Sequence, residues 1–126
     1  MASLYQILPA VAAALLALAM LGTANGAAAS WRVPAAVCAL FLGWSLYTVA
    51  AEGPLGFWPN HTQNAWGNQV WFDLLIAVGI GWALLLPRAR AVGMRPAPWL
   101  VLILCSGCIG LSAMLARCGY LESRRP

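Results

Sequence analysis

The sequence predicts an all-α integral membrane protein, a four-helix transmembrane bundle with short loops. Of its 126 residues, 63% are hydrophobic and only 8% are charged, whereas soluble domains have about 45–50% apolar and about 25% charged residues. The mean hydropathy is +0.80. Four apolar runs each approach the roughly 20 residues that a helix needs to cross a bilayer. The chain is therefore expected to be one membrane domain over residues 1–126.

Helix-breaking residues separate the predicted spans. The spans lie near residues 4–21, 33–51, 70–86 and 98–116. Each should be helical, because backbone groups in lipid must satisfy their own hydrogen bonds. Gly53 and Pro54 end the second run, Pro87 ends the third, and Pro96 and Pro98 open the fourth.

The first run also has a feature of a signal peptide, since residues 27–29 are three alanines that resemble a cleavage site. Residues 1–6 contain no lysine or arginine, however, and the apolar stretch is longer than a usual signal-peptide core. We therefore expect this segment to be retained as the first membrane helix.

All seven basic residues are arginines, and they flank apolar runs instead of forming the solvated face that nucleic acid would need. With four spans, three arginines lie on one side of the membrane and four on the other, so the positive-inside rule is almost silent. The arginines in the 87–97 loop favour a cytoplasmic position for it and a periplasmic 52–69 loop, and dual insertion stays open. The absence of lysine is typical of GC-rich bacterial genomes, which indicates a multi-pass protein of the bacterial inner membrane.

Asp73 is the one acid within a predicted span. Small residues at helical spacing predict three packing seams: Ala39 with Gly43, Ala77 with Gly81, and Ser106 with Gly110. Asp73 shares a helix face with Ala77 and Gly81. A charged residue costs about 2.5–3.5 kcal/mol at the membrane centre, so an acid there is by default a functional candidate. The structural alternatives are hydrogen bonds from Asn68 or Gln69, or a favourable interaction with the helix dipole.

Asp73 and Glu52 form the candidate catalytic pair, both on the same side of the membrane. A desolvated carboxylic acid has a raised pKa and can donate a proton, and aromatic faces stabilise cations. The aromatic residues that would line a shared pocket and bind substrate are Trp44, Tyr47, Trp58, Trp66, Trp71 and Phe72. This set suits an acid-initiated cyclase of a lipidic substrate or a cation exporter. For Glu52 the alternative is a solvated carboxylate at a helix end.

The other polar side chains predict neither a metal nor a cofactor. His61 is the only histidine, and one histidine with two distant carboxylates is a poor metal site. Cys105 and Cys108 form a C-x-x-C motif that resembles the one in membrane oxidoreductases of the vitamin K epoxide reductase type. Those enzymes need a second cysteine pair in a loop, which this chain lacks. We expect both cysteines to be small buried side chains.

Segments 71–77 and 87–95, followed by Trp99, resemble a family of small bacterial membrane proteins catalogued as a domain of unknown function. The shared pattern is an aspartate entering a span, a basic loop ending in Gly-Met, and a tryptophan before the last span. The resemblance covers about residues 40–122, and the apolar segment at the start departs from it. Members are loosely linked to integral membrane terpene cyclases, so the resemblance implies a membrane bundle and gives Asp73 weight.

The leading functional hypothesis is a small polytopic inner-membrane protein of uncharacterised function, without demonstrated catalysis. It would be embedded in the lipid bilayer and act as a homo-oligomer or as an accessory subunit. The first alternative is a terpene-cyclase-like enzyme with Asp73 and Glu52 as its acids. The second is a small cation or drug transporter, although small multidrug exporters carry their carboxylate in the first span and residues 4–21 contain none.

Overall fold

The chain is all-α in the computed structural model, which describes residues 3–126. Within that range it forms six helices and no strand. Three helices, α1 (Leu4–Ala24), α2 (Arg32–Glu52) and α4 (Ala65–Ala91), are long and apolar enough to cross a membrane. The 21 residues of α1 or α2 extend about 31 Å, which matches the hydrocarbon core of a bilayer. The first three predicted spans therefore correspond to continuous helices.

α4, which corresponds to the third predicted span, is longer than the apolar run at residues 70–86 at both of its ends. It begins at Ala65 and continues through Pro87 to Ala91, so Pro87 does not end it as expected. Proline is tolerated inside membrane helices, where local adjustments satisfy the carbonyl that it leaves free. The preceding segment was expected to be a loop, but it forms the short helix α3 (Phe57–Thr62), which packs on the start of α4.

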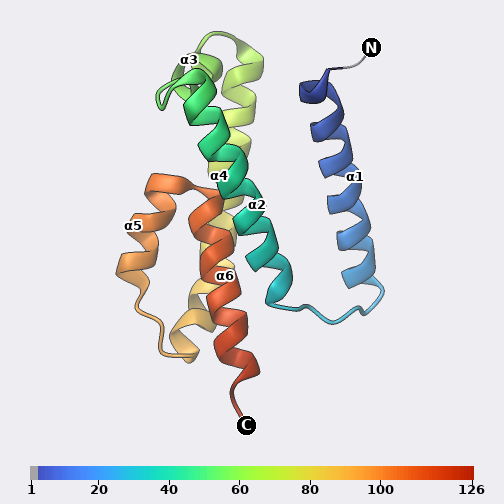
Figure 1. The fold of residues 1–126 in the computed structure, drawn as a ribbon. Helices are drawn as coiled ribbons and strands as arrows, with labels where there is room; N and C mark the ends of the chain where they lie inside the picture. The colour runs from blue at the N-terminus through green and yellow to red at the C-terminus, as the bar shows by residue number, and fades with distance from the viewer. Residues whose placement is uncertain (1–2) are drawn as a thin grey trace.

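The segment expected to be a fourth span is not one helix. α5 (Pro96–Ser106) ends at Gly107, and α6 (Cys108–Ser123) runs back beside it as the second arm of a hairpin (Figure 1). Gly107 has φ 61° and ψ −121°, a conformation open to glycine because it has no Cβ atom. The four-helix transmembrane bundle is thus not confirmed: the structure has three long apolar helices and a helical hairpin.

α6 occupies the centre of the molecule, where it contacts α2, α4 and α5. Met114 and Cys118 on α6 are fully buried and pack with Leu85 and Ala89 of α4 and with Ile103 of α5. α1 stands apart in Figure 1. It meets α2 through the hydroxyls of Tyr5 and Tyr47, which are 3.1 Å apart.

The three predicted packing seams have different outcomes. A Cβ atom at Gly110 would lie 2.8 Å from the Ile103 nitrogen, so this glycine lets α5 and α6 approach closely. Gly81 contacts Leu111 of α6 in the same way, whereas Gly43 has open space around its Cα atom. The seam of Gly43 is therefore not used within the chain.

One end of the molecule holds all seven arginines. The start of α2 meets the end of α6, since the rings of Trp31 and Tyr120 lie 5.3 Å apart. The end of α4 also meets α6, because Arg88 and Glu122 form an ion pair at 2.7 Å. The arginines lie at the start of α2, at the end of α4, just before α5, and along the last turns of α6 and beyond: Arg32, Arg88, Arg90, Arg95, Arg117, Arg124 and Arg125.

Close packing at Gly110 predicts a specific loss of stability. Gly110→Ala should lower the free energy of unfolding by about 1–3 kcal/mol, because the new methyl group meets the backbone of α5 and cannot move away. The measurement is the thermal unfolding midpoint of the purified protein in detergent. Gly43→Ala is the control, since nothing lies within 4 Å of a Cβ atom there. Equal midpoints for the two variants would contradict the tight hairpin.

Candidate amphipathic cleft

The two acids singled out from the sequence are both exposed. Glu52 is the last residue of α2, and Asp73 lies in the third turn of α4. Within residues 3–126, neither side chain makes a hydrogen bond or an ion pair, and neither lines the two cavities described below. Ala77, on the same face as Asp73, is also exposed. The face of Asp73 therefore packs on α6 only further along the helix, at Gly81.

The aromatic residues expected around these acids fall into separate groups. Trp44 and Tyr47 of α2 lie 5.2 Å apart and meet Tyr5 of α1. A second group on α3 and α4 joins Phe57 to Trp58 and Trp71, with centroid distances of 6.5 and 6.0 Å. The two remaining side chains, Trp66 and Phe72, are 78% and 55% exposed.

His61 belongs to the second aromatic group. Its ring lies 5.0 Å from that of Trp71, and its Nδ1 atom is buried without a hydrogen-bond partner. The carbonyl oxygen of His61 accepts a hydrogen bond of 2.6 Å from Asn68. These contacts fix α3 on α4, so the polar segment has a defined fold at the end of the molecule opposite the arginines.

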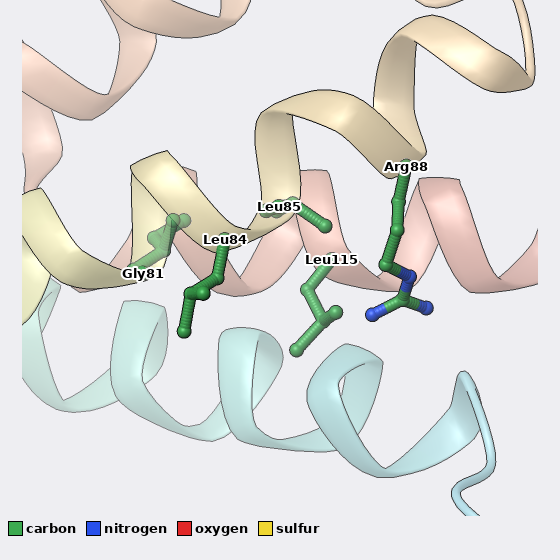
Figure 2. Close-up of a pocket in the computed structure, with 6 residues that line it drawn as sticks. Gly81, Leu84, Leu85, Arg88 and Leu115 are labelled. Atoms are coloured by element: carbon green, nitrogen blue, oxygen red, sulfur yellow. The ribbon is translucent and has the colours of Figure 1, made fainter.

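Two cavities adjoin each other, one between α4 and α6 and one at the start of α2. The first has a volume of 220 Å³, and α4 and α6 line it with mostly apolar side chains. Figure 2 shows Leu84 and Arg88 of α4 and Leu115 of α6 projecting into this space. The second has a volume of 660 Å³ and shares Arg88 and Leu115 with the first. Together they form what we call the amphipathic cleft, which is apolar toward Gly81 and polar toward Glu122 and Ser123.

The polar part of the amphipathic cleft contains a bidentate ion pair. Arg88 donates from Nε to Oε1 of Glu122 at 3.0 Å and from Nη2 to Oε2 at 2.7 Å. The Cys118 thiol donates to the same carboxylate at 3.7 Å. The hydrogen bonds from Arg88 hold the pKa of Glu122 below its ordinary value, although burial acts in the opposite direction. Glu122 is therefore ionised at neutral pH and is not available as a proton donor.

The four-span interpretation concealed this pair. It assigned Arg88 to one side of the membrane and the tail containing Glu122 to the other, so contact between them was excluded. The sequence does contain one signal, because Glu122 is the only acid near the C-terminal arginines. A carboxylate and a guanidinium that end two apolar segments are natural partners once both segments end on the same side.

The C-x-x-C motif lies at the tip of the hairpin. Cys105 is in the last turn of α5 and Cys108 is the first residue of α6, with Gly107 between them at the reversal. Both cysteines are free and exposed. The expectation that they are buried is therefore wrong, because both cysteines are exposed and neither belongs to the buried core around Met114.

No family model, curated protein or solved structure matches this chain. The resemblance to the family with the aspartate and Gly-Met pattern thus stays a prediction.

The Arg88–Glu122 ion pair predicts a stability that depends on pH. Since the pKa of Glu122 is lowered in the folded state, its contribution is present above the unfolded value of about 4.3 and is lost as the pH falls through the folded value. The side chains of Arg88 and Glu122 are 50% and 36% exposed, so we expect a contribution of at most about 1 kcal/mol.

The measurement compares wild type with Glu122→Gln in detergent. The thermal midpoint of the variant should be lower at pH 7, and the difference should shrink as the pH falls below about 4. Glu52→Gln is the matched control, because Glu52 has no ion-pair partner within the described part of the chain. A difference between wild type and Glu122→Gln that stays constant with pH would contradict the role of the ion pair.

Proposed function

We propose that this chain is a polytopic protein of the bacterial inner membrane, with three crossings and a hairpin that enters from the cytoplasmic side and returns to it. The observation that carries this topology is the Arg88–Glu122 ion pair. Two side chains 2.7 Å apart share one side of the bilayer, which requires α4 and α6 to end together. A continuous fourth span would separate them by the full thickness of the membrane.

In this topology the distribution of arginines assigns the orientation of the protein in the membrane. All seven arginines then lie at one boundary, and Glu52 and Asp73 lie toward the other. Cytoplasmic loops carry the excess of basic residues, so the end with the arginines is assigned to the cytoplasm. The loop that contains α3 faces the periplasm. The C-terminal tail moves to the cytoplasmic side, whereas four spans would have placed it in the periplasm.

We further propose that the protein acts as a homo-oligomeric or accessory subunit. α1 has no buried residue, and the seam at Gly43 is unoccupied. Membrane helices associate through small residues that permit close approach, and this open seam supports an association beyond the single chain. The cyclase and transporter hypotheses depend on Asp73 and Glu52, and neither of these residues lines the two cavities of the amphipathic cleft.

Reporter fusions test the topology. Green fluorescent protein folds to a fluorescent state in the cytoplasm, and alkaline phosphatase is active only in the periplasm. We expect fusions after Met94 and after the C-terminus both to fluoresce and to lack phosphatase activity, because both sites lie with the arginines. A fusion after Gln63 is the control and should show the reverse. Opposite results at Met94 and at the C-terminus would restore the four-span topology.

Substitution at the open seam tests the association. Gly43→Leu should abolish the oligomer or the stable complex that native mass spectrometry detects after extraction in mild detergent, because the side chain blocks close helix contact. The monomer should stay folded, since nothing in the chain lies near a Cβ atom at this position. Val37→Leu, at an exposed position about 120° around the same helix from Gly43, is the control and should leave the complex intact. A wild-type protein that is monomeric and without partner would contradict the proposal.

A further inference from the structure

Three arginines surround an aromatic pair at the mouth of the amphipathic cleft. The rings of Trp31 and Tyr120 meet edge to face at 5.3 Å. The Cζ atom of Arg32 lies 5.8 Å from the Trp31 ring centre, and those of Arg117 and Arg124 lie 5.7 and 5.9 Å from that of Tyr120. We call these five residues the arginine–aromatic cluster. It joins the start of α2 to the end of α6.

The charge of this cluster has no protein partner. Within residues 3–126, the only ion pair is that of Arg88 with Glu122. The other two acids, Glu52 and Asp73, lie toward the opposite end of the molecule. Arg32, Arg117 and Arg124 are exposed, and their guanidinium groups are oriented by the aromatic rings, which attract cations through the faces of their π systems. This concentration of exposed positive charge favours the binding of an anion at the cluster.

The cluster is joined to the amphipathic cleft through Trp31, which also lines the cavity of 660 Å³. Beyond it, Pro34 of α2 and Leu115 of α6 provide apolar walls. Leu115 also lines the adjoining cavity of 220 Å³, together with Leu84 and Leu111. A ligand that fits both parts would have an anionic head and an apolar chain.

We propose that the arginine–aromatic cluster binds the phosphate headgroup of an anionic phospholipid, with an acyl chain of the same lipid along the amphipathic cleft. Guanidinium groups bind phosphate oxygens through paired N–H donors. Basic pockets between helices at a membrane surface are suited to anionic lipid headgroups, and tryptophan and tyrosine favour the same depth. This inference depends on the membrane insertion proposed above but not on the orientation, because either leaflet presents headgroups at this boundary.

The test measures lipid binding by native mass spectrometry of the full chain in detergent. The probes are phosphatidylglycerol and phosphatidylcholine with identical acyl chains, and glycerol phosphate as the headgroup without chains. We expect phosphatidylglycerol to bind at least tenfold more tightly than phosphatidylcholine, and glycerol phosphate to bind much more weakly than the lipid. Equal affinity for the two lipids would overturn the proposal. Glycerol phosphate binding as tightly as phosphatidylglycerol would overturn the role of the acyl chain and assign the site to a free phosphate.

Matched charge variants separate a site from general attraction to the membrane. Arg117→Gln should weaken the binding of phosphatidylglycerol about fivefold, the equivalent of about 1 kcal/mol per arginine near an anionic surface. Arg90→Gln removes the same charge at the same end and, outside the cluster, should change the affinity less than twofold. Equal losses in the two variants would overturn the site and leave diffuse attraction.

Two further measurements keep a negative result interpretable. The thermal midpoints without lipid should agree among wild type, Arg117→Gln and Arg90→Gln. If Arg117→Gln is unstable, Arg117→Lys replaces it and should bind phosphatidylglycerol more weakly than wild type, because lysine keeps the charge but loses the paired donors. Carbonate extraction of membranes tests insertion separately. A protein that stays in the membrane but does not prefer phosphatidylglycerol contradicts the lipid site alone, whereas release into the soluble fraction contradicts the proposed function as well.

Discussion

The reversal of the chain at Gly107 is the constraint on which the rest of the structure depends. In the proposed topology this turn lies within the bilayer, where its backbone polar groups need partners in the protein because lipid offers none. The Gly107 N–H donates to the carbonyl of Ile103 at 2.6 Å, and the Leu111 N–H donates to the carbonyl of Gly107 at 3.1 Å. The Ser106 hydroxyl accepts from the N–H of Gly110 at 3.0 Å and donates to Leu102 at 2.6 Å. These four hydrogen bonds satisfy part of the backbone at the tip of the hairpin.

The reversal also explains why α6 is the centre of the molecule. Because α6 returns toward the end where α4 stops and α2 begins, it can contact both, and Met114 and Cys118 become the buried core. Contacts between α1 and the remainder are restricted to aromatic side chains near Tyr5. In lipid no hydrophobic force drives apolar helices together, so α1, if it crosses the membrane as proposed, stays separate unless specific side chains or another chain bind it.

Sequence patterns predicted the parts of the fold that depend on composition. The runs near 4–21 and 33–51 became helices with almost the same limits, since length and hydropathy determine a membrane span. The run at 98–116 is similarly apolar but folds as a hairpin. Hydropathy does not distinguish a straight helix from two helices that reverse direction, so the sequence pattern did not predict the turn. Gly107 lies at the reversal and Gly110 lies at a close helix contact. Because glycine serves both roles, the sequence alone does not show which glycine has which role. Asp73 was chosen as a candidate site because acidic residues are rare in this sequence. That rarity does not predict which side chains come into contact, and the acid that forms an ion pair is Glu122.

The reversal at Gly107 determines whether the arginines lie at both ends of the molecule or at one end. With a straight fourth helix, the arginines are divided almost equally, and the basic residues contain little information about orientation. With the reversal at Gly107, the same seven residues lie together, and Glu122 comes within reach of Arg88. The concentration of positive charge then has two consequences that share one physical cause. It underlies the proposed position of that end in the cytoplasm, and it underlies the proposed binding of an anionic headgroup by the three guanidinium groups around Trp31 and Tyr120.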